Sequence, residues 1–303
     1  MDPSSKIWLD GEILKYSDAK VPILTHSLQY GSGIFEGIRS YKGENGTTGI
    51  FRLDEHIDRF FHTASIYSMK LGYSKEELKK AIVDILKDNN LEDSYIRPFA
   101  FYNDDSIGMA TKNKKISVFI GAMPFGAYFA NKMEGIRCKV SSWNRINSTI
   151  LPVQAKASGN YINSIIASNE AYNLGYDEAI MISNGYVSEG PGENIFMIKN
   201  NELITPAPSD DILLGITRDT IIKFAPSLGY KVIERRISRA ELYLADEVFF
   251  AGTAAEITPI IEVDNIKIGN GEVGEITKKI AEKYNDIVRG KNSSYLNSIT
   301  YIN

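Results

Sequence analysis

The apolar residues of the chain recur with two different spacings, which predict both helices and strands. Between residues 54 and 69 they lie three and four positions apart, which predicts an amphipathic helix that Asp54 can cap. Ser74 and Glu77 have the spacing of a capping box, so a second amphipathic helix is predicted to run to about residue 89. We expect these two helices to cover one face of a sheet.

Short apolar runs bounded by turn residues predict the strands. Residues 6–14 form two such runs around Asp10-Gly11, a pair typical of a tight hairpin. The other expected strands are 94–101, 116–122, 136–143, 179–183, 195–199, 202–205, 231–237, 247–251 and 257–263. Helices are expected over 161–174 and near 217–227, 238–244 and 273–288. The pattern is that of an α+β protein.

The length and one Pro- and Gly-containing stretch predict two domains. A chain of 303 residues suggests two domains at roughly 150 residues each. The stretch that begins at Pro124 and Gly126 suits an interdomain connection. We therefore expect a first domain over 1–123, a linker over 124–134 and a second domain over 135–303.

Composition excludes several classes of function. Hydrophobic residues make up 43% and charged residues 24%, which is ordinary for a globular protein. The net charge of −4 offers no general attraction to nucleic acid. No apolar run is long enough for a membrane helix, and Cys138, the single cysteine, has no partner for an internal disulfide. Together with the absence of an apolar signal core near the start, these features lead us to expect a cytoplasmic protein.

Lys156 is the first candidate for chemistry. It is the sole ionisable side chain between Arg145 and Tyr161, and small residues flank it. About thirty residues later, Glu189 lies among glycines that let backbone approach a ligand closely. A lysine amine and a paired acid are what pyridoxal phosphate requires, since the amine forms a Schiff base and the acid keeps the pyridine nitrogen protonated.

A phosphate group needs backbone amides, hydroxyls and a fixed guanidinium. Arg59 on the first amphipathic helix, the Gly-Ile-Thr run at 215–217 and the Gly-Thr-Ala-Ala run at 252–255 can supply them. Each of these features alone has a plain structural explanation, as a solvated helix residue or a turn. Their combination with Lys156 and Glu189 carries the argument.

Seven strings in the same order resemble the branched-chain amino acid aminotransferases. They are YGSGIFEGIR at 30–39, YIRP at 95–98, SSWNR at 141–145, AKASGNY at 155–161, SEGPGEN at 188–194, GITR at 215–218 and GTAAE at 252–256. The resemblance runs from about residue 7 to about residue 287. It implies the fold-type IV class of pyridoxal 5'-phosphate enzymes, with a small N-terminal α/β domain and a larger C-terminal pseudo-barrel domain.

The resemblance assigns roles to the cofactor-binding residues. Lys156 would carry the cofactor and move the substrate proton, Glu189 would contact the pyridine nitrogen, and Tyr161 would donate to the cofactor 3' oxygen. Glu193 stays open as a second acid, with capping or pairing within its loop as the alternative. The phosphate would be held by Arg59, Ile216, Thr217, Gly252 and Thr253.

The resemblance also implies a substrate site with an apolar pocket and a separate grip on the carboxylate. The expected substrate-binding residues are Tyr30, Phe35, Gly37, Arg39, Tyr95, Arg97, Tyr128, Ala254 and Ala255. Phe125 resembles part of the apolar wall, at a position where the family often has tryptophan. Arg39 is favoured as the group that accepts a glutamate side chain, with an ion pair to Glu36 as the alternative.

The function implied is reversible transfer of an amino group between leucine, isoleucine or valine and 2-oxoglutarate, in a ping-pong cycle. D-amino acid aminotransferases and aminodeoxychorismate lyases stay open as alternatives, because they share the lysine and the acid. A catalytically silent phosphate-binding module is the alternative from another class. A homo-oligomer, either a dimer or a trimer of dimers, is implied, with Tyr30 reaching the neighbouring subunit's site.

Overall fold

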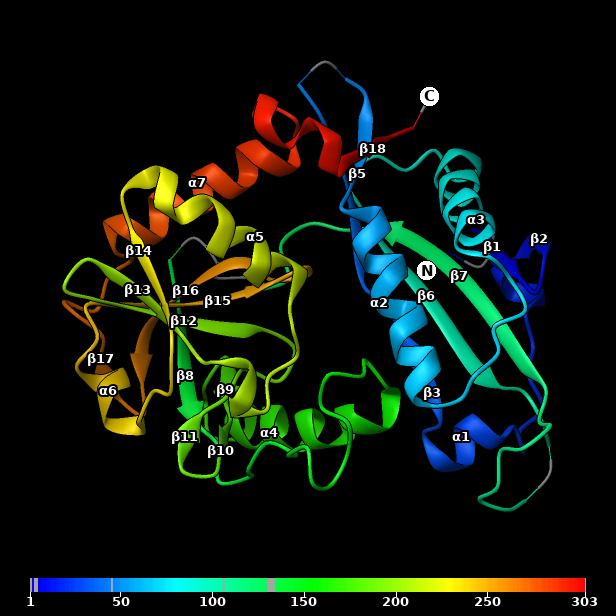
Figure 1. Cartoon of the computed structure of the whole chain (residues 1–303), viewed down its shortest axis with the longest axis horizontal. Coiled ribbons are helices and arrows are strands. Elements are labelled where there is room, and N and C mark those ends of the chain that lie inside the picture. Colours follow the sequence, from blue (N-terminus) through cyan, green and yellow to red (C-terminus); the bar gives the residue numbers. More distant parts are fainter. Residues whose placement is uncertain (1, 3–4, 45, 106, 130–133, 303) are drawn as a thin grey trace. The chain divides into compact units, whose positions relative to one another are not determined.

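The computed structural model of the chain describes residue 2 and residues 5–44, 46–105, 107–129 and 134–302. The chain divides into two compact units. The first contains residues 1–126, 155–159 and 287–303, and the second contains residues 127–154 and 160–286. Helices and strands of both units are labelled in Figure 1.

This division differs from the expected domain boundaries, which placed all of 135–303 in the second domain. Residues 155–159 join the first unit because the Phe35 amide donates to the Lys156 carbonyl at 3.0 Å and Ile34 forms a β-bridge with Ala157. Residues 287–303 join it because their strand β18 pairs with β5. Such long-range pairings leave no local sign in the sequence. Residues 130–133 of the expected linker 124–134 lie outside the described residues.

The first unit is built on an antiparallel sheet with the strand order β18-β5-β4-β6-β7-β1-β2, and β3 pairs with β6 beside this path. The strands are β1 (Lys6–Leu9), β2 (Glu12–Lys15), β3 (Gly33–Phe35), β4 (Ile38–Lys42), β5 (Thr48–Phe51), β6 (Ser94–Tyr102), β7 (Ile116–Pro124) and β18 (Ile299–Tyr301). The expected hairpin between β1 and β2 is confirmed, because Leu9 pairs with Glu12 across a two-residue turn. Asp10 and Gly11 both adopt positive φ, at 50° and 96°, as this turn requires.

Helices α2 (Leu53–Ile66) and α3 (Lys75–Asp88) pack on one face of this sheet, and α1 (His26–Tyr30) precedes β3. The capping box of α3 is confirmed: the Ser74 amide donates to Glu77 Oε2 at 2.7 Å, and the Glu77 amide donates to Ser74 Oγ at 3.2 Å. The expected cap of α2 by Asp54 is wrong. The helix begins at Leu53, after Arg52 in a left-handed conformation. Asp54 lies in the first turn, where its negative charge interacts favourably with the helix dipole.

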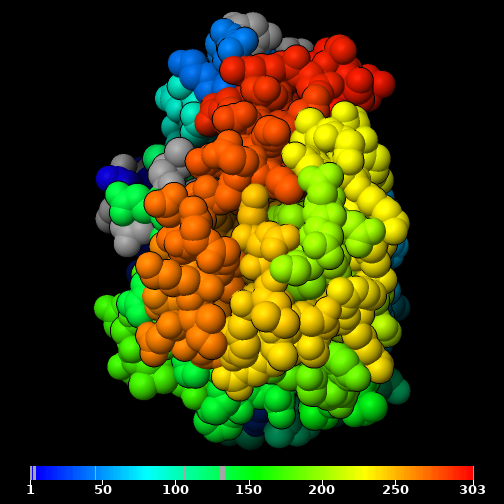
Figure 2. All heavy atoms as spheres, turned by 90° about the vertical axis from the view of Figure 1, so that its left-hand side faces the viewer, coloured from blue at the N-terminus to red at the C-terminus, as the bar shows by residue number. Residues whose placement is uncertain are grey.

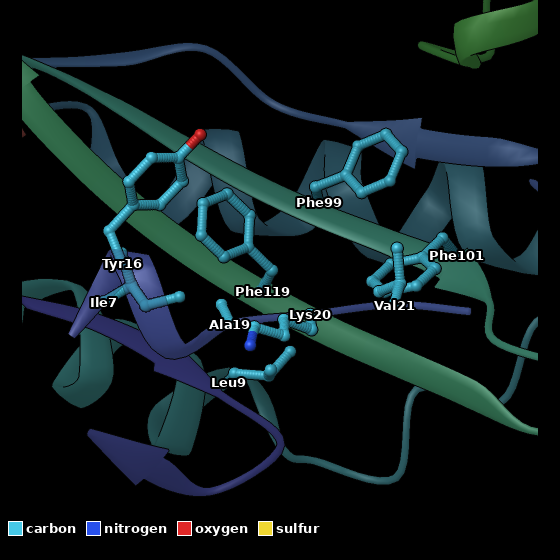
Figure 3. Close-up of a pocket in the computed structure, with 9 residues that line it drawn as sticks. All are labelled: Ile7, Leu9, Tyr16, Ala19, Lys20, Val21, Phe99, Phe101 and Phe119. Atoms are coloured by element: carbon cyan, nitrogen blue, oxygen red, sulfur yellow. The ribbon is translucent and has the colours of Figure 1, made fainter. Parts of the chain in front are cut away.

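The two faces of the first sheet carry different residues because strand side chains alternate. On β6, Ile96 and Ala100 join the core beneath the helices. Phe99 and Phe101 alternate with them and, with Phe119 of β7, line a pocket of about 180 Å³ (Figure 3). By the same alternation, Tyr95 and Arg97 share the face of Phe99, so this face holds two of the expected substrate-binding residues.

The second unit is built on a mixed sheet with the strand order β14-β13-β12-β15-β16-β8-β9, and β17 pairs with β16. Its strands are β8 (Ile136–Val140), β9 (Glu178–Ile180), β12 (Asn194–Lys199), β13 (Glu202–Thr205), β14 (Lys231–Glu234), β15 (Glu247–Gly252), β16 (Glu256–Val263) and β17 (Ile266–Lys267). A separate hairpin joins β10 (Ile182–Ser183) and β11 (Tyr186–Val187). Parallel pairs join β13 to β14, β16 to β8 and β8 to β9.

The helices of the second unit are α4 (Tyr161–Asn173), α5 (Ile216–Phe224), α6 (Arg239–Tyr243) and α7 (Glu275–Val288). All four lie close to the ranges expected from the apolar spacing. Figure 2 shows one face of this unit, where the yellow-green, yellow and orange segments from about residue 200 onward form a continuous surface. No helix among the described residues is both long and apolar enough to cross a membrane.

Candidate active site

The backbone of Lys156 is fixed on both sides within the first unit. Its carbonyl accepts from the Phe35 amide at 3.0 Å, and its own amide donates to Thr63 Oγ1 at 3.2 Å. Phe35 ends β3, and Thr63 is a buried residue of α2. The lysine therefore projects from a segment held between a strand and a helix.

The amine of Lys156 lies in an environment that favours its neutral form. Burial lowers its pKa, the positive charge of Arg59 lowers it further, and Glu36 opposes both, so that the pKa is about 8. Its Nζ lies 4.9 Å from the centre of the Phe35 ring. A larger share of neutral amine at neutral pH makes Lys156 a better nucleophile and base than a surface lysine.

Arg59 forms an ion pair with Glu36, a partner that was not expected from the sequence. Its Nε lies 2.6 Å from Glu36 Oε1 and its Nη2 lies 2.9 Å from Oε2. His56 Nδ1 lies 2.8 Å from the same Oε2. The expected alternative, an ion pair between Glu36 and Arg39, is not found among these contacts, because Glu36 meets Arg59 and His56. The spacing of His56, Arg59 and Thr63 on one face of α2 is the sequence signal that could have revealed this cluster.

The first unit contains a second group of expected substrate-binding residues, namely Phe35, Gly37, Tyr95 and Arg97. Arg97 Nη2 donates to Tyr95 Oη at 3.0 Å, and its guanidinium lies 4.6 Å from the Phe35 ring centre. Arg97 Nε is buried with no hydrogen-bond partner among the described residues. A Cβ on Gly37 would overlap Tyr95 Oη and would lie 2.9 Å from its Cζ. Glycine is therefore required at residue 37 for Tyr95 to occupy its place.

The other expected substrate-binding residues of the first unit do not form a single contact group. Arg39 is buried, donates to the Phe125 carbonyl at 3.3 Å and stacks on the Tyr41 and Phe125 rings. The Phe125 ring also lies 5.1 Å from that of Tyr95. Tyr30 ends α1 and is 36% exposed, with its ring 4.6 Å from that of His26.

Tyr128 lies at the start of the second unit and is 49% exposed. Its ring packs against the Phe129 ring, with the two centres 4.7 Å apart. The tyrosine side chain thus retains a large accessible surface, as a residue of a pocket wall would need.

Glu189 is the centre of a buried polar cluster in the second unit. Arg145 Nη2 lies 2.9 Å from its Oε1, while the Asn194 side chain and the Leu213 amide each donate to its Oε2 at 3.0 Å. Glu189 is 4% exposed and Arg145 is 6% exposed. Arg145 Nε and Nη1 have no hydrogen-bond partner among the described residues. These donors stabilise the ionised carboxylate, which can accept from further donors.

Asn194 links Glu189 to the start of α5. Its side chain also donates to the Leu213 carbonyl at 2.9 Å. A Cβ on Gly215 would overlap Asn194 Oδ1 and would lie 3.2 Å from its Cγ. Gly215 precedes Ile216 and Thr217, the first residues of α5, and amides at this end of a helix point outward along its axis. Asn194 and Arg145 were not expected as site residues, although they belong to the SEGPGEN and SSWNR strings.

Residues 253–255 form the turn between β15, which ends at Gly252, and β16, as the small residues of the run predict. Gly252 faces the Gly192–Glu193 loop, since a Cβ there would lie 3.4 Å from the Gly192 carbonyl oxygen. The structure thus brings the Glu189 loop and the turn that contains Thr253 and Ala254 to the same part of the second unit. Ala255 is buried, and its carbonyl accepts from Thr258 Oγ1 at 2.8 Å.

Two other expected residues of the second unit have defined places. Tyr161 is the first residue of α4 and is partly buried. Glu193 folds back on its own loop, where the Gly192 amide donates to its Oε2 at 3.1 Å and the Gly190 amide donates to its carbonyl at 2.7 Å. This geometry supports the interpretation of Glu193 as a residue that pairs within its loop.

A family comparison identifies the chain. The model of the family described as "Amino-transferase class IV" matches residues 33–263. The chain belongs to the class IV aminotransferase family. The resemblance found in the sequence and the fold-type IV α+β architecture are thereby confirmed.

Members of the family match over almost their whole length. The branched-chain-amino-acid aminotransferase of Pseudomonas aeruginosa is 45% identical, over 97% of this chain and 96% of that protein. The crystal structure of the Thermoproteus uzoniensis branched-chain aminotransferase with norvaline is 48% identical, with a TM-score of 0.94 and coverage of 99% of this chain and 100% of that one. A T.th. branched-chain amino acid aminotransferase complexed with N-(5'-phosphopyridoxyl)-L-glutamate is 37% identical, with a TM-score of 0.94 and 99% of both chains covered.

The residues of this chain fit the cofactor of the family. Lys156 supplies an amine with a lowered pKa, and Arg59 supplies a guanidinium that is fixed by Glu36. Glu189 supplies a carboxylate held in its charged form by Arg145, and α5 supplies the amides of a helix start. Amine, guanidinium, carboxylate and helix amides are the groups that pyridoxal 5'-phosphate requires.

Proposed function

We propose that this protein is a branched-chain-amino-acid aminotransferase that transfers the amino group of leucine, isoleucine or valine to 2-oxoglutarate and uses pyridoxal 5'-phosphate. The observation that carries the proposal is Lys156, a lysine with a lowered pKa and a backbone fixed from both sides, in a chain of the class IV family. The named relatives are branched-chain aminotransferases, and one was crystallised with a phosphopyridoxyl-glutamate. Both substrate classes of the proposed reaction therefore have support.

When bound, pyridoxal 5'-phosphate supplies an electron-withdrawing ring that stabilises negative charge at the substrate α-carbon. We propose that Lys156 would hold the cofactor through its Nζ amine, and that the same amine would carry the proton removed from and returned to the substrate α-carbon. Glu189 would keep the pyridine nitrogen protonated, and the adjacent charge of Arg145 favours the ionised form of its carboxylate. Tyr161 would donate to the cofactor 3' oxygen. Arg59, Ile216, Thr217, Gly252 and Thr253 would hold the phosphate.

The substrate would be bound through separate polar and apolar contacts. Tyr30, Tyr95 and the amides of Ala254 and Ala255 would hold the α-carboxylate, and Arg97 would orient Tyr95 through their 3.0 Å hydrogen bond. Phe35, Phe125 and Tyr128 would form the apolar wall, and Gly37 would leave room for Tyr95. Arg39 would accept the second carboxylate of glutamate. When leucine is bound, the buried guanidinium would keep its charge, which the Tyr41 and Phe125 rings stabilise.

The test is a half-reaction screen. The purified protein is loaded with pyridoxal 5'-phosphate, mixed in turn with L- and D-amino acids, and followed by the absorbance change as the cofactor takes up the amino group. L-Leucine, L-isoleucine, L-valine and L-glutamate should react, and D-leucine and D-alanine should react far more slowly. Rapid reaction of D-alanine, or release of pyruvate from aminodeoxychorismate, would refute the proposal in favour of one of the related activities.

We also propose that the protein acts in the cytoplasm as a homo-oligomer, a dimer or a trimer of dimers, in which Tyr30 reaches the neighbouring site. In the first unit, several large apolar side chains are exposed near Tyr30 in the sequence and in the loop after β6: Ile23 (80%), Leu28 (59%), Ile107 (80%) and Met109 (77%). Exposed apolar groups of this kind favour a protein partner. Light scattering gives the molar mass, and mixed oligomers of a Tyr30→Phe chain with a Lys156→Ala chain test whether Tyr30 acts across subunits.

A further inference from the structure

We propose that Glu36 is a positioning residue of the cofactor site: it fixes the guanidinium of Arg59 in the orientation that grips the cofactor phosphate, and His56 fixes Glu36 in turn. This inference rests on the proposed function, because it takes Arg59 as a phosphate ligand. Glu36, His56 and Arg59 all belong to the first unit, so the cluster stands on contacts within one compact body.

The geometry of the pair is that of a strong Arg–carboxylate contact. Both Glu36 oxygens face one edge of the guanidinium, with Nε at 2.6 Å from Oε1 and Nη2 at 2.9 Å from Oε2. Two parallel hydrogen bonds of this kind fix the plane of a guanidinium as well as its position. Glu36 is 0% exposed, and the Arg59 side chain is 14% exposed. Because Glu36 is inaccessible to solvent, an anion from solution cannot take its place beside Arg59.

The carboxylate of Glu36 is itself locked in place. His56 Nδ1 lies 2.8 Å from Oε2, and the Gly37 amide donates to the same oxygen at 3.2 Å. Burial lowers the pKa of His56, so the imidazole stays neutral and donates from Nδ1. Burial pushes the pKa of Glu36 up, but Arg59 and His56 outweigh it and hold the pKa far below its usual range. The cluster thus contains one anion, one cation and one neutral donor.

One face of α2 supports this cluster and the reactive lysine together. His56, Arg59 and Thr63 are three and four residues apart, so they share a face of the helix. Thr63 Oγ1 accepts from the Lys156 amide at 3.2 Å, while Arg59 and His56 meet Glu36. Helix α2 therefore positions both Arg59, the candidate phosphate ligand, and Lys156. Glu36, which follows the last residue of β3, connects this helix to the sheet.

A change from Glu36 to Asp separates orientation from charge. The shorter side chain withdraws the carboxylate by about 1.5 Å, which is too far to keep both hydrogen bonds to Arg59, but it keeps the negative charge. The matched control is Glu55→Asp. Glu55 lies on the same helix and pairs at 2.7 Å with Arg52, the residue that precedes the helix. Its side chain is 42% exposed, and it makes no contact that we assign to the site.

The experiment measures the dissociation constants of pyridoxal 5'-phosphate and of pyridoxal, which lacks the phosphate, for the apoprotein and its variants. The ratio is the dissociation constant of pyridoxal divided by that of pyridoxal 5'-phosphate, and it reports how much the phosphate contributes to binding. It is a binding measurement that does not depend on turnover. We expect Glu36→Asp to reduce the ratio by at least about tenfold, or about 1.4 kcal/mol, and Glu55→Asp to change it by less than about twofold.

His56 gives a second pair of variants for the case in which Glu36→Asp fails to fold, as judged by circular dichroism. His56→Leu removes the donor to Glu36 and should reduce the ratio, whereas His56→Asn places an amide donor near the position of Nδ1 and should restore it. Equal weakening of both ligands would assign Glu36 a general structural role and overturn the proposal. An unchanged ratio in Glu36→Asp, or in His56→Leu, would overturn it as well. If the unchanged protein fails to bind pyridoxal 5'-phosphate, the proposed function itself is wrong, which is a distinct outcome.

Discussion

Arg145 and Glu189 form a buried ion pair, with Arg145 Nη2 at 2.9 Å from Glu189 Oε1 and both side chains almost fully inaccessible. The pair is completed on the acid side by Asn194 and the Leu213 amide. Three donors that face a buried carboxylate favour its ionised form, which is the form that a partner of a pyridinium nitrogen needs. Arg145 therefore favours the ionised form of Glu189 without the help of a ligand.

Glu189→Gln should slow turnover far more than it weakens substrate binding. The amide keeps the shape of the carboxylate but loses the charge that would hold the pyridine nitrogen protonated, so the loss falls on the chemical step. Steady-state kinetics with L-leucine and 2-oxoglutarate should show a large fall in kcat with KM changed much less. Glu193→Gln is the control, because Glu193 bonds within its own loop. Near-normal kcat in Glu189→Gln with a large loss in Glu193→Gln would transfer the role to Glu193.

Arg145→Met should destabilise the protein strongly. Removing one partner of a buried ion pair leaves an uncompensated charge, which costs about 3–5 kcal/mol. Urea unfolding of the apoprotein, followed by circular dichroism, measures this loss. The double variant Arg145→Met with Glu189→Gln should recover part of it, because no unpaired charge then remains. A loss below about 1 kcal/mol in the single variant would show that the pair is not buried in solution.

Lys156 should capture pyridoxal 5'-phosphate at a rate that rises with pH through about 8 and then levels off. Only the neutral amine is nucleophilic, and burial with the charge of Arg59 lowers the pKa to about 8. The protonated amine therefore predominates below this pH and the reactive amine above it. Stopped-flow absorbance on the apoprotein follows the capture. The control is Lys156→Ala, which should show no covalent capture, no turnover and an unchanged circular dichroism spectrum. A rate that keeps rising well beyond the pKa, without a plateau, would mean that the amine is not perturbed.

Gly37→Ala should impair all amino acid substrates together. The added Cβ would overlap Tyr95 Oη, so Tyr95 must move and its hydrogen bond from Arg97 is lost. Misplacement of a binding group by about 1 Å can cost about a hundredfold in rate. We expect kcat/KM for leucine, valine and glutamate to fall by similar factors of that order. Gly126→Ala is a control for a glycine change in the same unit, since no atom lies within 4 Å of a Cβ there and Gly126 does not adopt a left-handed φ. A loss confined to one substrate would place Tyr95 on the side-chain pocket instead.

Local sequence patterns predicted the elements with strong periodicity. The spacing of apolar residues gave the helices that became α3 and α4 to within a residue or two, and the Ser74–Glu77 box marked the start of α3. The strands β6, β12, β13, β15 and β16 followed from their apolar runs. Short elements were missed. α1 has only five residues and β3 only three, so neither is long enough to repeat its pattern.

The partners of the site residues were harder to predict than the residues themselves. Lys156 and Glu189 stood out because of their unusual neighbours in the sequence. The pairing of Glu36 with Arg59 spans 23 residues and two elements, and that of Arg145 with Glu189 joins distant loops. Nothing in local composition specifies which acid meets which arginine; the packing of α2 against β3 decides the first pair. The same limit applies to residues 155–159, whose contacts with the first unit leave no local sign in the sequence.

The path of the chain through residues 155–159 has a consequence for biosynthesis. These five residues complete the first unit but are made after residues 127–154 of the second, and the edge strand β18 is made after residues 160–286 of the second unit. A nascent chain that ends near residue 126 would lack the reactive lysine and would leave the edge of β5 open to other strands. We therefore expect such a fragment to aggregate when it is expressed alone. Competence to capture the cofactor should arise only late in synthesis, when the ribosome has released the C-terminal segment.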